Sequence, residues 1–138
     1  MKNHAGPSVT LHVCITCRRG EEPLEPKQER SGAKMWNAFA GQIENRLNAS
    51  DICLLPVECL SGCKRACTVA VTAPDKWTYV IADLDPAQHA EDILTFAEQY
   101  AAHPEGLPLW RERPEIVKRS VLARVPPLQP AREEEQAA

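Results

Sequence analysis

The sequence VTLHVCITC, residues 9–17, joins the pattern of a β-strand directly to a pair of cysteines. Apolar and polar residues alternate over 9–13, which is the period of a half-buried strand. The next segment, residues 20–31, is polar and contains Pro23 and Pro26, as expected of a loop. This region therefore predicts a strand that ends at two cysteines and continues into a loop.

A helix is expected after the loop, with Ser31 as its N-cap. Its apolar residues recur at helical spacing and form one stripe: Trp36, Phe39, Ala40, Ile43 and Leu47. Residues 52–57 are an apolar run that contains Pro56, which predicts a strand near the edge of a sheet. A strand, a helix and a second strand thus follow one another in the first half of the chain.

The second half predicts a hairpin and another helix. Residues 69–71 and 77–81 alternate in polarity on either side of Pro74-Asp75, a sequence typical of a turn. Asp85 is the expected N-cap of the second helix, because a proline follows it directly and Gln88 stands three residues on. The predicted order is β-α-β-β-β-α, an α/β fold with a mixed sheet and two helices.

The C-terminal part loses this periodicity. We expect residues 104–114 to form a proline-rich strap that packs on the domain through Leu107, Leu109 and Trp110. Residues 115–138 are predicted to be an extended, largely disordered tail. With residues 1–8 as a flexible N-terminus, the predicted domain spans 9–114.

Composition and charge limit the classes of function. A chain of 138 residues has room for one domain, and a net charge of −3 argues against a nucleic-acid-binding protein. The sequence contains no apolar run long enough for a membrane helix and no secretory signal, so a cytoplasmic protein is expected. Thiols stay reduced in that compartment, and the six cysteines are therefore interpreted as ligands or redox groups.

Five cysteines form two groups, Cys14-x-x-Cys17 and Cys59-x-x-x-Cys63-x-x-x-Cys67. Each group follows a predicted strand, and the ends of neighbouring parallel strands lie side by side in a βαβ arrangement. Thiolates gathered at one edge of a sheet are soft ligands that select zinc or an iron–sulfur cluster. The spacing leaves both metals open.

The first pair also matches a thioredoxin-type redox motif. Such a dithiol enzyme needs no further cysteines, and it carries a proline where Ala66 and Cys67 stand here. A thiol oxidoreductase is therefore the less favoured hypothesis. We find no Ser-His-Asp set, phosphate-binding loop or paired catalytic carboxylates, so an electron carrier or metal-binding protein is favoured over an enzyme.

Two resemblances add to this interpretation. The stretch VECLSGC, residues 57–63, followed by the strand at 69–71, resembles the second cysteine pair of thioredoxin-like [2Fe-2S] ferredoxins and of the small iron–sulfur subunit of respiratory complex I. Residues 14–127 resemble a family of predicted metal-binding proteins with a domain of unknown function, often found near cobalamin-synthesis genes. The motifs that carry this second resemblance are CITCRR, VECLSGCKRACTVA, KWTYV, DLDP and WRERPE.

The resemblance implies a thioredoxin-like fold and a [2Fe-2S] cluster held by Cys14, Cys17, Cys59 and Cys63, with Cys67 as an alternative or exchanging ligand. The ferredoxins space their first pair more widely and lack a cysteine at the position of Cys67. The implied function is an electron carrier in a cobalamin-related pathway, with a protein redox partner and with a homodimer as an alternative to a monomer. A zinc-binding structural or metal-handling protein is the other hypothesis.

Four cations flank the cysteines: Arg18, Arg19, Lys64 and Arg65. Near a cluster they would lower thiolate pKa values and raise the reduction potential, and otherwise they are solvated loop residues. Cys53 lies inside an apolar strand and is expected in the core.

Overall fold

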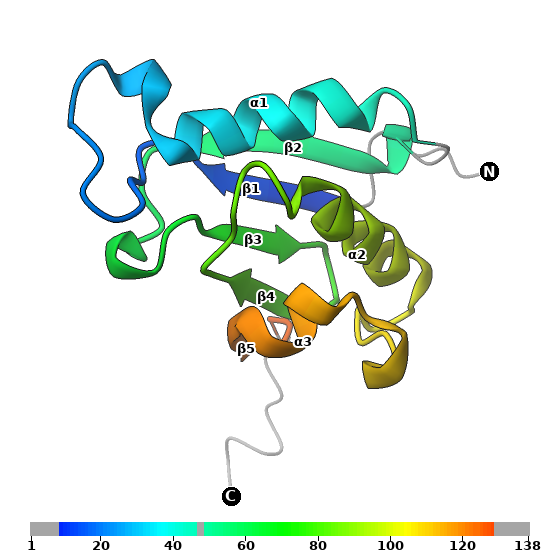
Figure 1. Ribbon diagram of the computed structural model, residues 1–138. Helices are drawn as coiled ribbons and strands as arrows, with labels where there is room; N and C mark the ends of the chain where they lie inside the picture. Colours follow the sequence, from blue (N-terminus) through cyan, green and yellow to red (C-terminus); the bar gives the residue numbers. More distant parts are fainter. Residues whose placement is uncertain (1–8, 47–48, 129–138) are drawn as a thin grey trace, which may run out of the picture.

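The computed structural model describes residues 9–46 and 49–128. Its centre is a five-stranded mixed sheet in the order β2-β1-β3-β4-β5 (Figure 1). The strands are β1 Val9–Cys14, β2 Ile52–Val57, β3 Val69–Thr72, β4 Thr78–Ile81 and β5 Val121–Val125. β1 and β2 pair in parallel, and the other pairs are antiparallel. The predicted edge position of β2 and the hairpin between β3 and β4 are confirmed.

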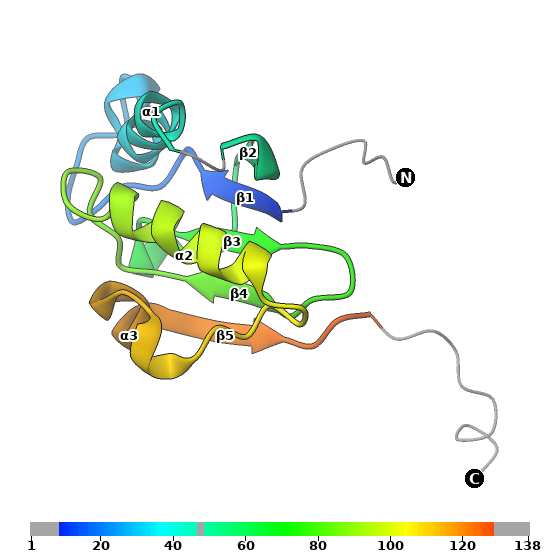
Figure 2. The ribbon, with the colours of Figure 1, turned by 90° about the vertical axis from the view of Figure 1, so that its right-hand side faces the viewer.

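Three α-helices accompany the sheet: α1 Ser31–Ile43, α2 Ala90–Ala102 and α3 Glu115–Ser120. Short 3-10 helices lie at Lys27–Glu29, Ala49–Asp51, Cys63–Arg65 and Trp110–Glu112. α1 contacts α2, β1 and β2, and α2 also contacts β1 and α3 (Figures 1 and 2). Among these described helices, none is long and apolar enough to cross a membrane.

The core lies between the sheet and the helices. β1 contributes Val9, Leu11 and Val13, which alternate with half-buried residues as the sequence pattern predicts. In α1 the fully buried side chains are Met35 and Phe39, whereas the predicted Trp36 is only partly buried against them. The apolar face of α1 is therefore rotated by about one residue from the predicted stripe, whose last member, residue 47, lies outside the described part.

Neither predicted helix cap is correct. Ser31 is already inside α1, and its hydroxyl donates to the carboxylate of Glu22 instead of capping the helix. The Asp85 carboxylate accepts the Ala87 N–H at 2.8 Å, and its carbonyl accepts the His89 N–H at 3.0 Å. These bonds close a separate turn, so α2 begins only at Ala90.

The prediction of a strap followed by a disordered tail is wrong in two respects. Leu107 does pack against the core, but Leu109 and Trp110 are 51% and 59% exposed. The guanidinium of Arg113 holds the segment instead, because its Nε donates to the Pro108 carbonyl at 2.9 Å and its Cζ lies 5.4 Å from the centre of the Tyr79 ring.

Residues 115–125 are also not a tail. They form α3 and β5, and β5 pairs with β4, which would otherwise be an unpaired edge (Figure 2). The fold therefore has three helices and five strands in the described chain, not two helices and four strands. The remaining tail prediction, over residues 129–138, and the flexible N-terminus predicted over residues 1–8 lie outside the described residues.

Replacing Val117 in α3 tests whether this region belongs to the fold. Val117 is fully buried in the core, so Val117→Ala should lower the free energy of unfolding by about 2 kcal/mol. Val125→Ala, at the exposed end of β5, is the matched control and should cost less than about 1 kcal/mol. Urea denaturation measures both, and equally small losses would contradict a folded C-terminal region.

Candidate metal centre

The first cysteine pair is preformed and buried. Cys14 is the last residue of β1, Cys17 lies in the following loop, and their Sγ atoms are 2.8 Å apart. The two residues are 2% and 4% exposed, and Ala66 and Leu60 pack around them. The sheet thus delivers two thiols to one sheltered point.

Gly32 explains how α1 can approach this pair. Its N–H donates to the Cys17 carbonyl at 2.9 Å. A Cβ atom at this position would lie 2.5 Å from the Cys14 carbonyl oxygen and 2.9 Å from the Cys17 nitrogen, both backbone atoms. Only glycine leaves room for the first turn of the helix against the Cys14–Cys17 loop.

The second cysteine group, Cys59, Cys63 and Cys67, begins just after β2, whose end lies beside the end of β1. β1 and β2 pair in parallel with Cys14 opposite Val57, so the segment that leads to Cys59 starts beside the first pair. The hydroxyl of Thr16 donates to the Glu58 carbonyl and ties the two segments together. The predicted meeting of the two strand ends is therefore confirmed.

The three cysteines of this group have different surroundings. Cys59 is exposed, and its Sγ accepts the Ser61 N–H at 3.2 Å. Cys63 is exposed at the start of a 3-10 helix. Cys67 is fully buried after a cis peptide bond, and its backbone exchanges two hydrogen bonds of 3.1 Å with Leu84. The group thus presents two exposed thiols and one that is anchored in the core.

Hydrogen bonding makes the first pair asymmetric. The Cys17 thiol donates to Cys14, which lowers the pKa of Cys14 to about 5. The same bond raises the pKa of Cys17, and burial and the charges of Cys14, Cys67 and Cys63 raise it further. Burial raises the pKa of Cys67 to about 12.

The flanking cations do more than cover a solvated loop. Arg18, Arg19 and Lys64 line an open cavity of about 620 Å³ together with Cys63. Arg65 is not among the residues that line this cavity, and it pairs with Asp83, its Nε lying 2.9 Å from both carboxylate oxygens. Arg19 in turn forms an ion pair with Asp85 at 3.2 Å, so the positive charge beside the cysteines comes mainly from Arg18 and Lys64.

Sequence reasoning missed several residues of this region. Glu22 accepts the backbone N–H groups of Arg19 at 3.2 Å and of Ser31 at 3.0 Å, which joins the Cys14–Cys17 loop to the start of α1. Asp83 forms an ion pair with Arg65 of the second cysteine segment, and Asp85 forms one with Arg19 of the first. Glu22 belongs to no periodic pattern or motif, whereas Asp83 and Asp85 lie in the DLDP motif, which gave no signal that they would pair with arginines.

The donor set fits a thiolate-ligated centre in its chemistry, since the two segments that carry the five thiols meet at one end of the sheet. Of the predicted ligands, only Cys14 and Cys17 have their sulfurs in contact. Within residues 9–46 and 49–128, no three Cys, His, Asp or Glu side chains are gathered closely enough to hold a metal ion. The assignment of Cys14, Cys17, Cys59 and Cys63 as ligands, with Cys67 as the alternative, stays a prediction.

A protein-family model covers this architecture from end to end. It matches residues 11–127, and its description is "Protein of unknown function (DUF1636)". The chain belongs to the DUF1636 family. The match includes both cysteine groups, α3 and β5, so residues 115–127 of the predicted tail are part of what the family shares. No curated protein matches the chain.

Solved structures show the fold of this DUF1636 protein. It is similar to a thioredoxin-like [2Fe-2S] ferredoxin from Aquifex aeolicus, with a TM-score of 0.58 at 16% identity over 86% of this chain and 94% of that one. The wild-type structure of the thioredoxin-like [2Fe-2S] ferredoxin from the same organism at 1.5 Å resolution gives a TM-score of 0.53 at 20% identity, over 86% and 99% of the two chains. The predicted thioredoxin-like α/β fold is confirmed.

The asymmetry of the first pair can be measured in metal-free protein. The ultraviolet absorbance of the Cys14 thiolate, taken as the difference between wild type and Cys14→Ser, should appear as pH rises through about 5, because the pKa of this thiol is lowered. Cys17→Ala removes the donor and should move the midpoint up toward the ordinary value of 9.0. A midpoint that Cys17→Ala leaves in place would show that another group stabilises the thiolate.

Proposed function

We propose that this protein binds a [2Fe-2S] cluster through Cys14, Cys17, Cys59 and Cys63 and carries single electrons to a protein partner. The observation that carries the proposal is the buried pair of sulfurs 2.8 Å apart at the end of β1. In the parallel pairing with β2, this pair lies beside the segment that brings the second cysteine group. The likeness to thioredoxin-like ferredoxins supports the choice of cluster.

When bound, a [2Fe-2S] cluster supplies a reversible one-electron couple. The chain contributes ligands and surroundings of unequal character. Cys14 and Cys17 are shielded by Ala66 and Leu60, which excludes water from one side. Cys63 lies at the open cavity with Arg18 and Lys64, whose charges offset those of the thiolates and favour the more negative, reduced state. Electron exchange is thus expected on the Cys63 side.

Cys17 and Cys67 compete for the fourth ligand position. The Cys17 sulfur already contacts that of Cys14, whereas Cys67 is held in the core by its backbone bonds to Leu84. A short Cys-x-x-Cys chelate is also common in metal sites. We therefore favour Cys17, with Cys67 as the alternative or exchanging ligand.

The cellular setting is part of the same proposal. A cytoplasmic location would keep the cysteines reduced, so that the five in the two groups are available as ligands. The partner would be a redox protein, and the resemblance noted in the sequence suggests a cobalamin-related pathway.

Anaerobic purification tests the identity of the centre. The protein should be red-brown and should contain about two iron ions and about two acid-labile sulfides per chain. Its electron paramagnetic resonance spectrum after one-electron reduction should show a single spin per cluster. A colourless protein with one zinc and no sulfide would contradict the electron carrier and support the zinc-binding alternative.

Serine variants test the ligand set. Cys14→Ser, Cys59→Ser and Cys63→Ser should each remove the cluster or shift its absorption spectrum strongly, because a hydroxyl is a poor substitute for a thiolate. Cys53→Ser is the control: Cys53 is a partly buried residue in β2 rather than the core residue expected, and its Sγ lies 3.8 Å from the Leu54 carbonyl. It should leave the iron content unchanged.

Two outcomes of this series would alter the proposal. Normal clusters in both Cys59→Ser and Cys63→Ser would refute the site. Loss of the cluster in Cys67→Ser but not in Cys17→Ser would keep the site and replace Cys17 by Cys67 as the fourth ligand.

A second function is favoured by one observation. The pair Cys14–Cys17 combines sulfurs in contact with a lowered pKa at Cys14, which is also the arrangement of a dithiol redox pair. A protein without iron or zinc that forms a reversible Cys14–Cys17 disulfide in glutathione buffers would support a thiol oxidoreductase instead.

A further inference from the structure

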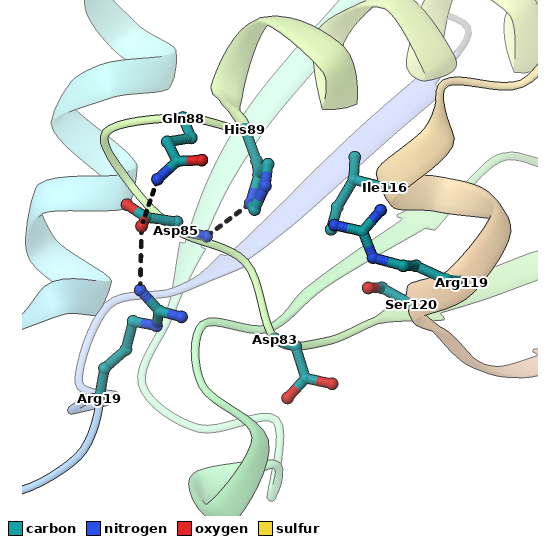
Figure 3. Close-up of a pocket in the computed structure, with 8 residues that line it drawn as sticks. All are labelled: Arg19, Asp83, Asp85, Gln88, His89, Ile116, Arg119 and Ser120. Carbon is teal, nitrogen blue, oxygen red and sulfur yellow. Dashed lines mark hydrogen bonds and ion pairs between the residues drawn. The ribbon is translucent and has the colours of Figure 1, made fainter.

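A second cavity of about 460 Å³ lies beside the cysteine region, between the turn that precedes α2 and the helix α3 (Figure 3). The polar residues that line it include Arg19, Asp83, Asp85, His89, Arg119 and Ser120. Arg19 also lines the cavity next to Cys63, so the two cavities are neighbours. None of the predicted cluster ligands lines this second cavity.

The charges around the cavity do not cancel. Asp83 is neutralised by the guanidinium of Arg65, at 2.9 Å, and Asp85 by that of Arg19, at 3.2 Å. Among the described residues, no carboxylate pairs with Arg119. Figure 3 shows its guanidinium beside Ile116, turned toward the cavity. The cavity therefore carries one uncompensated positive charge at Arg119.

Ser120 adds a hydroxyl at the wall of the cavity. The residue is only 4% exposed, and its carbonyl accepts the Ala82 N–H at 3.0 Å, which fixes its position at the end of α3. Its Oγ makes no hydrogen bond within the described chain and points into the cavity (Figure 3). The hydroxyl lines the cavity, so it is free to donate to a molecule bound there.

His89 supplies a second donor. Its Nδ1 accepts the Asp85 N–H at 2.8 Å, and a backbone N–H can only donate. The neutral ring must therefore carry its proton on Nε2. Burial lowers the pKa of His89, with Arg119 and Arg19 lowering it further and Asp85 and Asp92 opposing them, so the ring remains neutral near pH 7. Figure 3 shows the ring between Asp85 and Ile116, at the edge of the cavity.

We propose that this cavity binds a small molecule through an oxyanion group, a phosphate or a carboxylate, held by the Arg119 guanidinium and by hydrogen bonds from Ser120 Oγ and His89 Nε2. Charge-assisted bonds from a planar guanidinium are the strongest that a side chain offers to such groups. A volume of about 460 Å³ leaves space for a small organic remainder. The proposal does not depend on the cluster.

Calorimetric titration of the purified full chain at pH 7 and low salt tests this site, with inorganic phosphate in one series and succinate in another. One saturable site is expected for at least one of the two anions, and the tighter one identifies the group that is recognised. Arg119→Gln should weaken that binding about tenfold or more, and Ser120→Ala several-fold, because each removes one donor.

Arg111→Gln is the matched control. Arg111, in the 3-10 helix Trp110–Glu112, is exposed like Arg119 but does not line the cavity, so its loss should leave the affinity unchanged. Three results would overturn the proposal. The first is no saturable binding of either anion, and the second is equal weakening of binding by Arg111→Gln and Arg119→Gln. The third is that the single variants Ser120→Ala and Arg119→Gln both keep full affinity. Melting temperatures confirm that each variant is folded.

Discussion

Strand β1 is paired on both sides, in parallel with β2 and antiparallel with β3, and it ends at Cys14. The pairing continues past the strand, because the Cys14 N–H donates to the Thr68 carbonyl at 3.2 Å and the Ile15 N–H to the Val57 carbonyl at 2.9 Å. Two neighbouring segments thus hold the backbone of the first cysteine pair. Those segments lead to Cys59 and from Cys67, so the sheet itself brings the thiols to one end.

Ion pairs join this end of the sheet to the turn before α2. Arg19, from the first cysteine segment, binds Asp85, and Arg65, from the second, binds Asp83. Partly exposed pairs of this kind contribute little to stability, on the order of 0–1 kcal/mol each. Their structural effect is to occupy both carboxylates, which leaves the cavity beside them positively charged. The cysteine region and the second cavity are therefore parts of one charged surface.

Patterns carried by short segments predicted most of the fold. Alternation in 9–13 and 69–81 placed β1 and the hairpin, because a strand buried on one face must alternate whatever its partners are. The short strand β5 escaped this reasoning, since four of its five residues are exposed and its existence depends on the free edge of β4. The Asp85 motif led to a wrong start for the second helix, because the same carboxylate can cap a turn as well as a helix.

By itself, the sequence determined the number and grouping of the cysteines and the order of the first six elements. It also determined that the two cysteine groups follow strands that end side by side at one end of the sheet. Those features depend on residue type and spacing, which are local properties of the chain. Only the tertiary structure decided that Cys14 and Cys17 are buried in contact, that Cys59 and Cys63 remain exposed, and that Arg119, Ser120 and His89 face one cavity. Burial, pKa and an unpaired charge depend on neighbours that are distant in sequence, and no local pattern encodes them.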